Sequence, residues 1–198
     1  ASDKTITIGG DWENNAGLSG FNAGTGRVIF NGTEHQYVKS SENFNILEAN
    51  MEATLCVDNV AHTLTCNKYD WKKGGIDVIK GTFTALDLVQ NGIFGSYYVN
   101  PDATINLHQD AAGLIDLNGQ LNFNGGGNIN IYGGSSSSYW PWDGNAEINM
   151  NGGVLDFKDQ KIYIYNSPSY SFTHNITGGT IRTSKGLSCY RTDFTPAK

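Results

Sequence analysis

The chain alternates apolar and polar residues in pieces of only four or five residues, separated by glycine and asparagine. Clear examples are RVIF at 27–30, TINL at 104–107, QLNF at 120–123 and KIYIY at 161–165. Alternation over so short a length is typical of a β-strand with one buried face. No segment of helical length has a convincing apolar stripe with a 3.6-residue period. The pattern therefore predicts an all-β protein whose short strands are joined by tight turns.

The alternating segments also resemble one another at a long spacing. LIDLNGQLNFNGGGNINIY at 114–132 can be aligned with EINMNGGVLDFKDQKIYIY at 147–165, an offset of 33 to 34 residues. A third copy at 175–189 follows about 26 residues after the second. Three strands per unit and a glycine corner after the first strand indicate the coil of a solenoid.

We therefore expect residues 1–198 to form a single domain, a single-stranded parallel β-helix of about eight coils. In this alignment Ile115 lies below Ile148 and Phe123 below Phe157, in apolar columns inside the helix. An antiparallel β-sandwich is the alternative fold, because Asn-Gly corners also suit hairpin turns. The sandwich does not explain why the apolar pattern repeats at a fixed long offset.

The charge and the apolar content exclude two classes of partner. The net charge is −6 and the isoelectric point is near 5.0, whereas a nucleic-acid-binding face must be basic. No apolar run approaches the roughly 18 residues of a membrane-spanning helix. The chain opens with ASDKTITIGG, which has no charged and then apolar leader, so we expect either a cytoplasmic protein or a processed, mature one.

Three cysteines leave the redox compartment open. Cys56 and Cys66 lie ten residues apart on successive expected strands, so a turn could bring them together as a disulfide. The alternative, which we favour, is three buried and unpaired thiols that act as small apolar residues. No cysteine and histidine spacing indicates a zinc site, and we expect neither a metal nor a cofactor.

One aromatic segment breaks the alternation. Residues 133–145 include SSSSYWPWDG, and because the first two copies are spaced more widely than the last two, we interpret this segment as an inserted, protruding loop. Aromatic faces beside hydroxyl, amide and carboxylate groups suit sugar rings. The predicted contact residues are Tyr139, Trp140, Trp142 and Asp143, extended by Tyr165 and Tyr170 in the smaller bend at 165–172. The alternatives are a lid packed on the helix and contact with another protein.

Enzymatic chemistry finds little support in the pattern. A glycoside hydrolase needs two carboxylates in a cleft, and no strand-aligned aspartate pair indicates one. Asp156, Lys158, Asp159 and Lys161 form a weak candidate for a calcium-dependent lyase, and we favour the alternative that they are a solvated surface of alternating charges. An ice-binding array would need a continuous Thr-x-Thr ladder, and this pattern stops before the later coils. A β-helix lyase or glycoside hydrolase stays an alternative function.

The first forty residues resemble a known repeat. GGDWENNAGLSGFNAGTGRVIFNGTEHQYV at 9–38 is similar to the type GDW-x-NN-G…F-x-GTG-x-V-x-FNG…Q, which recurs in large secreted and cell-surface proteins of gut and environmental Bacteroidota-type bacteria. The segment RTDFTP at 191–196 resembles the point where such a repeat restarts. The resemblance implies a right-handed parallel β-helix that is a fragment of a longer, exported, adhesin-like chain. It places the motif's apolar positions, Trp12, Phe21, Val28 and Phe30, in the core.

The expected function is therefore a non-catalytic adhesin or stalk segment, secreted or at the cell surface, that contacts glycan or a surface protein. A purely structural spacer is the third possibility. Since the ends of a β-helix leave strand edges unpaired, self-association through these ends is a further expectation.

Overall fold

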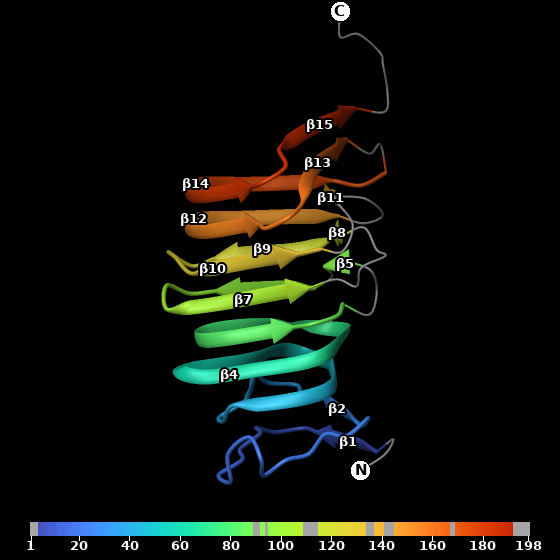
Figure 1. Cartoon of the computed structure of the whole chain (residues 1–198), viewed down its shortest axis with the longest axis vertical. Helices are drawn as coiled ribbons and strands as arrows, with labels where there is room; N and C mark the ends of the chain where they lie inside the picture. The colour runs from blue at the N-terminus through green and yellow to red at the C-terminus, as the bar shows by residue number, and fades with distance from the viewer. Residues whose placement is uncertain are drawn as a thin grey trace, which may run out of the picture.

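The computed structural model describes residues 4–88, 92–93, 95–108, 115–133, 137–140, 145–166 and 169–191. Its strands stack into a solenoid, with the chain rising from the N-terminal coil at one end to the last coil at the other (Figure 1). No helix occurs in these ranges, and every strand pair is parallel. The predicted all-β parallel solenoid is confirmed.

The strands are short except where one runs through successive corners. They are β1 (Thr5–Ile8), β2 (Arg27–Phe30), β3 (Gln36–Tyr37), β4 (Glu42–Ala85), β5 (Gly92–Ile93), β6 (Ser96–Val99), β7 (Ala103–His108), β8 (Ile115–Leu117), β9 (Gly119–Phe123), β10 (Asn128–Tyr132), β11 (Ser137–Trp140), β12 (Ala146–Phe157), β13 (Lys161–Asn166), β14 (Phe172–Thr183) and β15 (Leu187–Arg191). They form one ten-stranded and one five-stranded sheet.

The coil is shorter than the sequence alignment indicates. Phe123 pairs with Met150, and Ile131 pairs with Phe157, so the alignment of Phe123 with Phe157 is wrong. Ile148 likewise pairs with Leu121. Register partners in adjacent coils lie between 19 and 27 residues apart. The alignment is displaced by one strand and its corner, because the strands of every face carry the same alternation.

The number of turns also differs slightly from the sequence-based expectation. The regularly stacked turns number about six, compared with the eight that we expect. Some of the chain does not belong to the regularly paired strands. Between β1 and β2 the chain forms turns, and its β-pairing there is an isolated bridge between Trp12 and Val38. The expected number of eight comes from dividing the chain length by a constant coil length. Such a division counts the irregular connections as if they were paired strands, so it gives too many coils.

Alternate side chains build the core as columns along the solenoid axis. Phe83, Ile105, Ile129 and Leu155 follow one another in register from β4 to β12, and all four are fully buried. Removal of each such side chain from water contributes about 1.5–3 kcal/mol. The column ends at Ile181 in β14, which is 41% exposed because it belongs to the last coil.

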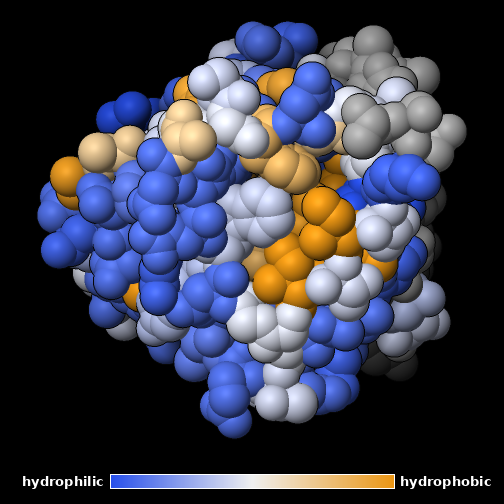
Figure 2. All heavy atoms as spheres, turned by 90° about the horizontal axis from the view of Figure 1, so that it is seen from below, coloured by the Kyte–Doolittle hydropathy of each residue, from blue (hydrophilic) through white to orange (hydrophobic). Residues whose placement is uncertain are grey.

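Apolar side chains are exposed at both ends of the stack. Ile6 of β1 is exposed at the N-terminal end, where an apolar patch lies among hydrophilic residues (Figure 2). Ile176 and Leu187 in β14 and β15 are exposed as well, although their register partners Met150 and Ile162 are buried. Self-association through these ends stays a prediction.

Positive-φ glycines make the corners that the alternation requires. Gly95 has φ = 92° and Gly119, one coil further on, has φ = 98°. A Cβ atom added at Gly119 would lie 2.3 Å from the carbonyl oxygen of Gly95. Glycine is therefore needed there both for its backbone conformation and for the close approach of the two coils.

A buried glutamine closes the first corner. The Oε1 atom of Gln36 accepts a hydrogen bond of 2.7 Å from the N–H of Gly32, and its Nε2 donates to the carbonyl of Ile8 at 3.0 Å. Buried backbone groups at an irregular corner need such partners. This gives a structural role to the glutamine of the FNG…Q motif.

Candidate binding site

Part of the aromatic segment belongs to the solenoid ladder. Ser137–Trp140 is strand β11, which pairs in parallel with β8 and β13. Its backbone places Tyr139 beside Asp116 in one neighbouring coil and beside Tyr163 in the other. These four residues form a regular strand, whereas residues 134–136 and 141–144 of the expected insertion lie outside the described residues, so a protruding loop over 133–145 stays a prediction.

The other predicted contact residues are only partly placed. Trp142 and Asp143 lie outside the described residues. Trp140 is in register with Ile164, and Tyr165 belongs to the backbone of β13. Tyr170, just before β14, is exposed. Glycan contact through this set of aromatic residues stays a prediction.

The possible disulfide is not formed. Cys56 and Cys66 are free thiols, and both are buried. Burial raises the pKa of both thiols, most strongly that of Cys66, which lies within the core. The alternative of buried and unpaired cysteines is the arrangement that the structure shows for these two residues.

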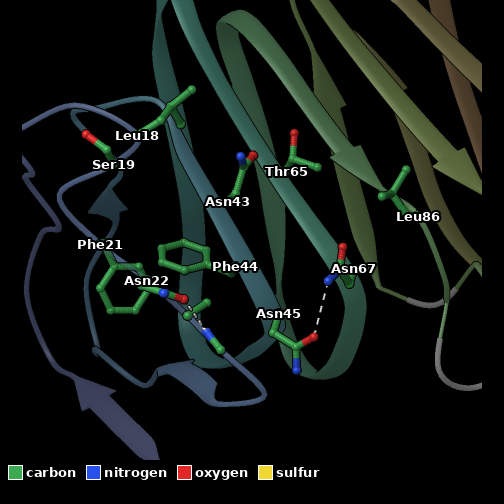
Figure 3. A pocket seen from close by; sticks show the side chains of 12 residues that line it. Leu18, Ser19, Phe21, Asn22, Asn43, Phe44, Asn45, Thr65, Asn67 and Leu86 are labelled. Carbon is green, nitrogen blue, oxygen red and sulfur yellow. Dashed lines mark hydrogen bonds between the residues drawn. The ribbon is translucent and has the colours of Figure 1, made fainter. Parts of the chain in front are cut away.

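A groove lies at the N-terminal coils, away from the predicted aromatic residues. Its volume is about 600 Å³ (Figure 3). One wall is the irregular segment between β1 and β2, and the floor consists of β4 residues from two successive coils. The lining residues are Leu18, Ser19, Phe21, Asn22, Ala23, Gly24, Asn43, Phe44, Asn45, Thr65, Asn67 and Leu86.

Local hydrogen bonds and aromatic contacts hold the wall of the groove in place. The side chain of Asn22 accepts a hydrogen bond of 3.0 Å from the N–H of Gly24, which tightens the turn. The ring of Phe21 packs edge-on against Trp12 and Phe44, with centroids 4.9 and 5.8 Å apart. Because Phe44 belongs to the core, these contacts fix the loop to the solenoid.

The family-like motif contributes directly to this site. Val28 and Phe30 are buried in the core, as the resemblance implies. Trp12 and Phe21 are partly buried and pack against the core. Phe21 also lines the groove, a role that its position in the motif does not reveal.

The lining combines amides with apolar side chains and contains no charged residue. Asn67 donates a hydrogen bond of 3.2 Å to the Oδ1 atom of Asn45 one coil below it. Leu18 and Leu86 are both exposed beside these amides. Such a lining can form hydrogen bonds with neutral hydroxyl groups and can cover apolar C–H surfaces.

The described residues include the carboxylates of the weak lyase candidate. They contain no group of three or more histidine, cysteine or acidic residues that could hold a metal ion. In the weak lyase candidate, the carboxylate of Asp156 is engaged by Lys158, with Nζ and Oδ2 2.6 Å apart. No helix in the described part of the chain is long and apolar enough to cross a membrane.

Comparisons with models of protein families, with curated proteins and with solved structures find no match. The likeness of residues 9–38 to repeats of exported surface proteins is therefore a resemblance and nothing more. The surface of the solenoid is therefore the main basis for a functional proposal.

Sequence reasoning missed the groove for a physical reason. The asparagines of ENFN and TLTCN stand at outward positions of alternating segments, which is a visible signal. Asn45 and Asn67 come into contact because the coil between them is 22 residues long. The sequence alignment gave offsets of 33 to 34 and about 26 residues, so it did not predict a contact between residues 22 apart.

Proposed function

We propose that the protein is a non-catalytic binding module that holds an uncharged glycan in the groove. The observation that carries the proposal is the composition of the lining, in which amide side chains alternate with Phe21, Leu18 and Leu86 and no charge is present. The wider setting, a secreted or cell-surface adhesin or stalk, rests on the resemblance of residues 9–38.

Sugar rings match both halves of this lining. Their C–H faces pack on aromatic and aliphatic side chains, and their hydroxyls act as donors and acceptors towards amides, which can do both. Desolvating a neutral ligand costs less than desolvating a charged one, and this lining offers no counter-ion to a uronate or a sulfate ester. Neutral glycans are therefore expected to bind in preference to anionic ones, with little dependence on salt.

The test is binding to soluble neutral and anionic polysaccharides by calorimetry. Asn43 lines the groove, is exposed, and makes none of the side-chain hydrogen bonds found in the described residues. We expect Asn43→Ala to weaken binding of a neutral glycan by roughly tenfold, which corresponds to one lost hydrogen bond of about 1.4 kcal/mol. Asn175→Ala is the matched control, because Asn175 is an exposed asparagine of β14 far along the stack.

Four outcomes would reject the proposal. Equal loss in both variants would indicate a general effect on the fold. Binding that survives Asn43→Ala and disappears in a Trp140→Ala/Trp142→Ala double variant would move the site to the aromatic segment. No binding to any neutral glycan by the folded protein would leave a structural spacer, and bond cleavage in the glycan would favour the enzyme alternative.

A further inference from the structure

The face of the solenoid above the groove carries two columns of threonine and asparagine. Thr82, Thr104 and Asn128 are in register in one column, and Thr84, Asn106 and Asn130 in the other. The backbone hydrogen bond from Leu86 to Cys66 continues both columns downward to Thr63 and Thr65. We call this surface the amide face, which consists of Asn43, Asn45, Thr63, Thr65, Asn67, Thr82, Thr84, Thr104, Asn106, Asn128 and Asn130.

The amide face is continuous with the groove. Asn43, Asn45, Thr65 and Asn67 belong to both surfaces. The residues between the column positions, such as Phe83 and Ile105, are fully buried, so the column side chains face outward by the alternation of a strand. With coils stacked about 4.8 Å apart, five coils extend the surface over about 20 Å along the axis.

Hydrogen bonds between coils fix the orientation of the amides. Asn106 donates to the hydroxyl of Thr84 at 3.1 Å, and Asn130 donates to the Oδ1 atom of Asn106 at 2.9 Å. Each bond uses one N–H of an amide that has two, and one lone pair of an oxygen that has two. In each coil, these side chains therefore keep a donor and an acceptor that a ligand can use. Such groups repeat at the coil spacing, and the side chains that carry them are already held in place.

Charge is absent from this surface although the protein has 13 basic and 19 acidic residues. His108 borders the face and stacks on Tyr132 with ring centroids 4.2 Å apart, and burial lowers its pKa, which favours the neutral imidazole. Along the column of Thr84, Asn106 and Asn130 the next position is charged, because Asp156 follows Asn130 in register and pairs with Lys158. The neutral surface thus ends at β12.

We propose that the groove and the amide face form one track for an extended, uncharged polysaccharide chain that runs along the solenoid axis, across the strands. This inference rests on the proposed function and adds the class of ligand, a long linear chain rather than a short oligosaccharide. The coil spacing is close to the length of one sugar ring in an extended chain, so successive sugars would meet equivalent donors and acceptors. The groove would hold one part of the polysaccharide, and the amide face would hold the next part.

The test is the dependence of affinity on chain length. Calorimetry is performed with a series of neutral oligosaccharides, from disaccharide to octasaccharide, cut from a neutral polysaccharide that binds. We expect the affinity of the native protein to rise at least roughly tenfold between the trisaccharide and the hexasaccharide, as further sugars reach the amide face. Asn128→Lys places a long cation on the face at an exposed position, and we expect it to abolish this rise while leaving the trisaccharide affinity unchanged.

Asn175→Lys provides the matched control, and it should leave both affinities as in the native protein. Affinity that is flat with chain length, or a rise that survives Asn128→Lys, would overturn the track while the proposed function stands. A failure of every neutral saccharide to bind would reject the proposed function as well. Inhibition of ice recrystallisation that Asn128→Lys abolishes, without any saccharide binding, would assign the face to the lattice of ice and overturn the track.

Discussion

An ion cluster on the first coils offers a direct test of how the stack is stabilised. Arg27 of β2 forms ion pairs with Glu48, one coil above it, and with Asp70, one coil further, where its Nη1 atom lies 2.6 Å from Oδ2. Lys72 completes the cluster at 2.8 Å from the other oxygen of Asp70. Arg27→Met removes the cation that joins three coils and leaves two nearly buried carboxylates as neighbours.

The expected loss follows from burial. Removing one partner of a buried ion pair costs about 3–5 kcal/mol, and because the side chain of Arg27 is 32% exposed we expect the lower end, about 3 kcal/mol. For a chain of this size that corresponds to a fall in melting temperature of roughly 6–12 °C. The matched control is Lys73→Met, since Lys73 and Glu52 form an ion pair of 2.5 Å with both side chains more than half exposed, and it should cost less than about 1 kcal/mol.

Acidification should reduce the difference between the native protein and the variant. Burial alone would raise the pKa of Asp70, but hydrogen bonds and ion pairs with Lys72 and Arg27 outweigh it and hold that pKa below its usual value of 3.8. A lowered folded-state pKa stabilises the protein above the unfolded-state value, and this contribution is lost as the pH falls through the folded-state value. Urea unfolding at pH 7 and at pH 3 measures the difference. Equal costs for the two variants, or a cost of Arg27→Met that persists unchanged at pH 3, would refute the reasoning.

Two further predictions test the core and the register. The thiol of Cys66 should resist alkylation at pH 8 in the folded protein and react on unfolding, since it is fully buried and its pKa is raised; mass spectrometry of the labelled peptide would detect a contrary, rapid reaction. In a Cys189→Ser background, Gln120→Cys with Glu147→Cys should oxidise to a disulfide, because the native side chains meet at 2.8 Å and neighbouring strands lie within disulfide reach. Gln120→Cys with Val154→Cys, the pair that the sequence alignment brings together, should stay reduced, and the reverse result would restore the longer coil.

Much of the fold can be predicted from the sequence because it depends on local information. Alternation in RVIF or TINL gives the strand and its inward side, and the structure buries Val28, Phe30, Ile105 and Leu107 accordingly. Glycine marks corners such as Gly119, where the backbone is left-handed. The repetition of these units indicates stacking. None of these signals states which strand lies above which, because all faces of the coil carry the same alternation.

That missing register explains why the groove was not among the sites predicted from the sequence. The displaced alignment gave no indication that Ser137–Trp140 is a regular strand between β8 and β13. The same displacement hid the meeting of Asn45 with Asn67 and of Asn106 with Asn130, which are ordinary polar positions when each segment is viewed alone. A surface made of stacked coils takes one or two side chains from each coil. Its chemistry can therefore be deduced only after the coil length is known, and in this chain that length varies from 19 to 27 residues.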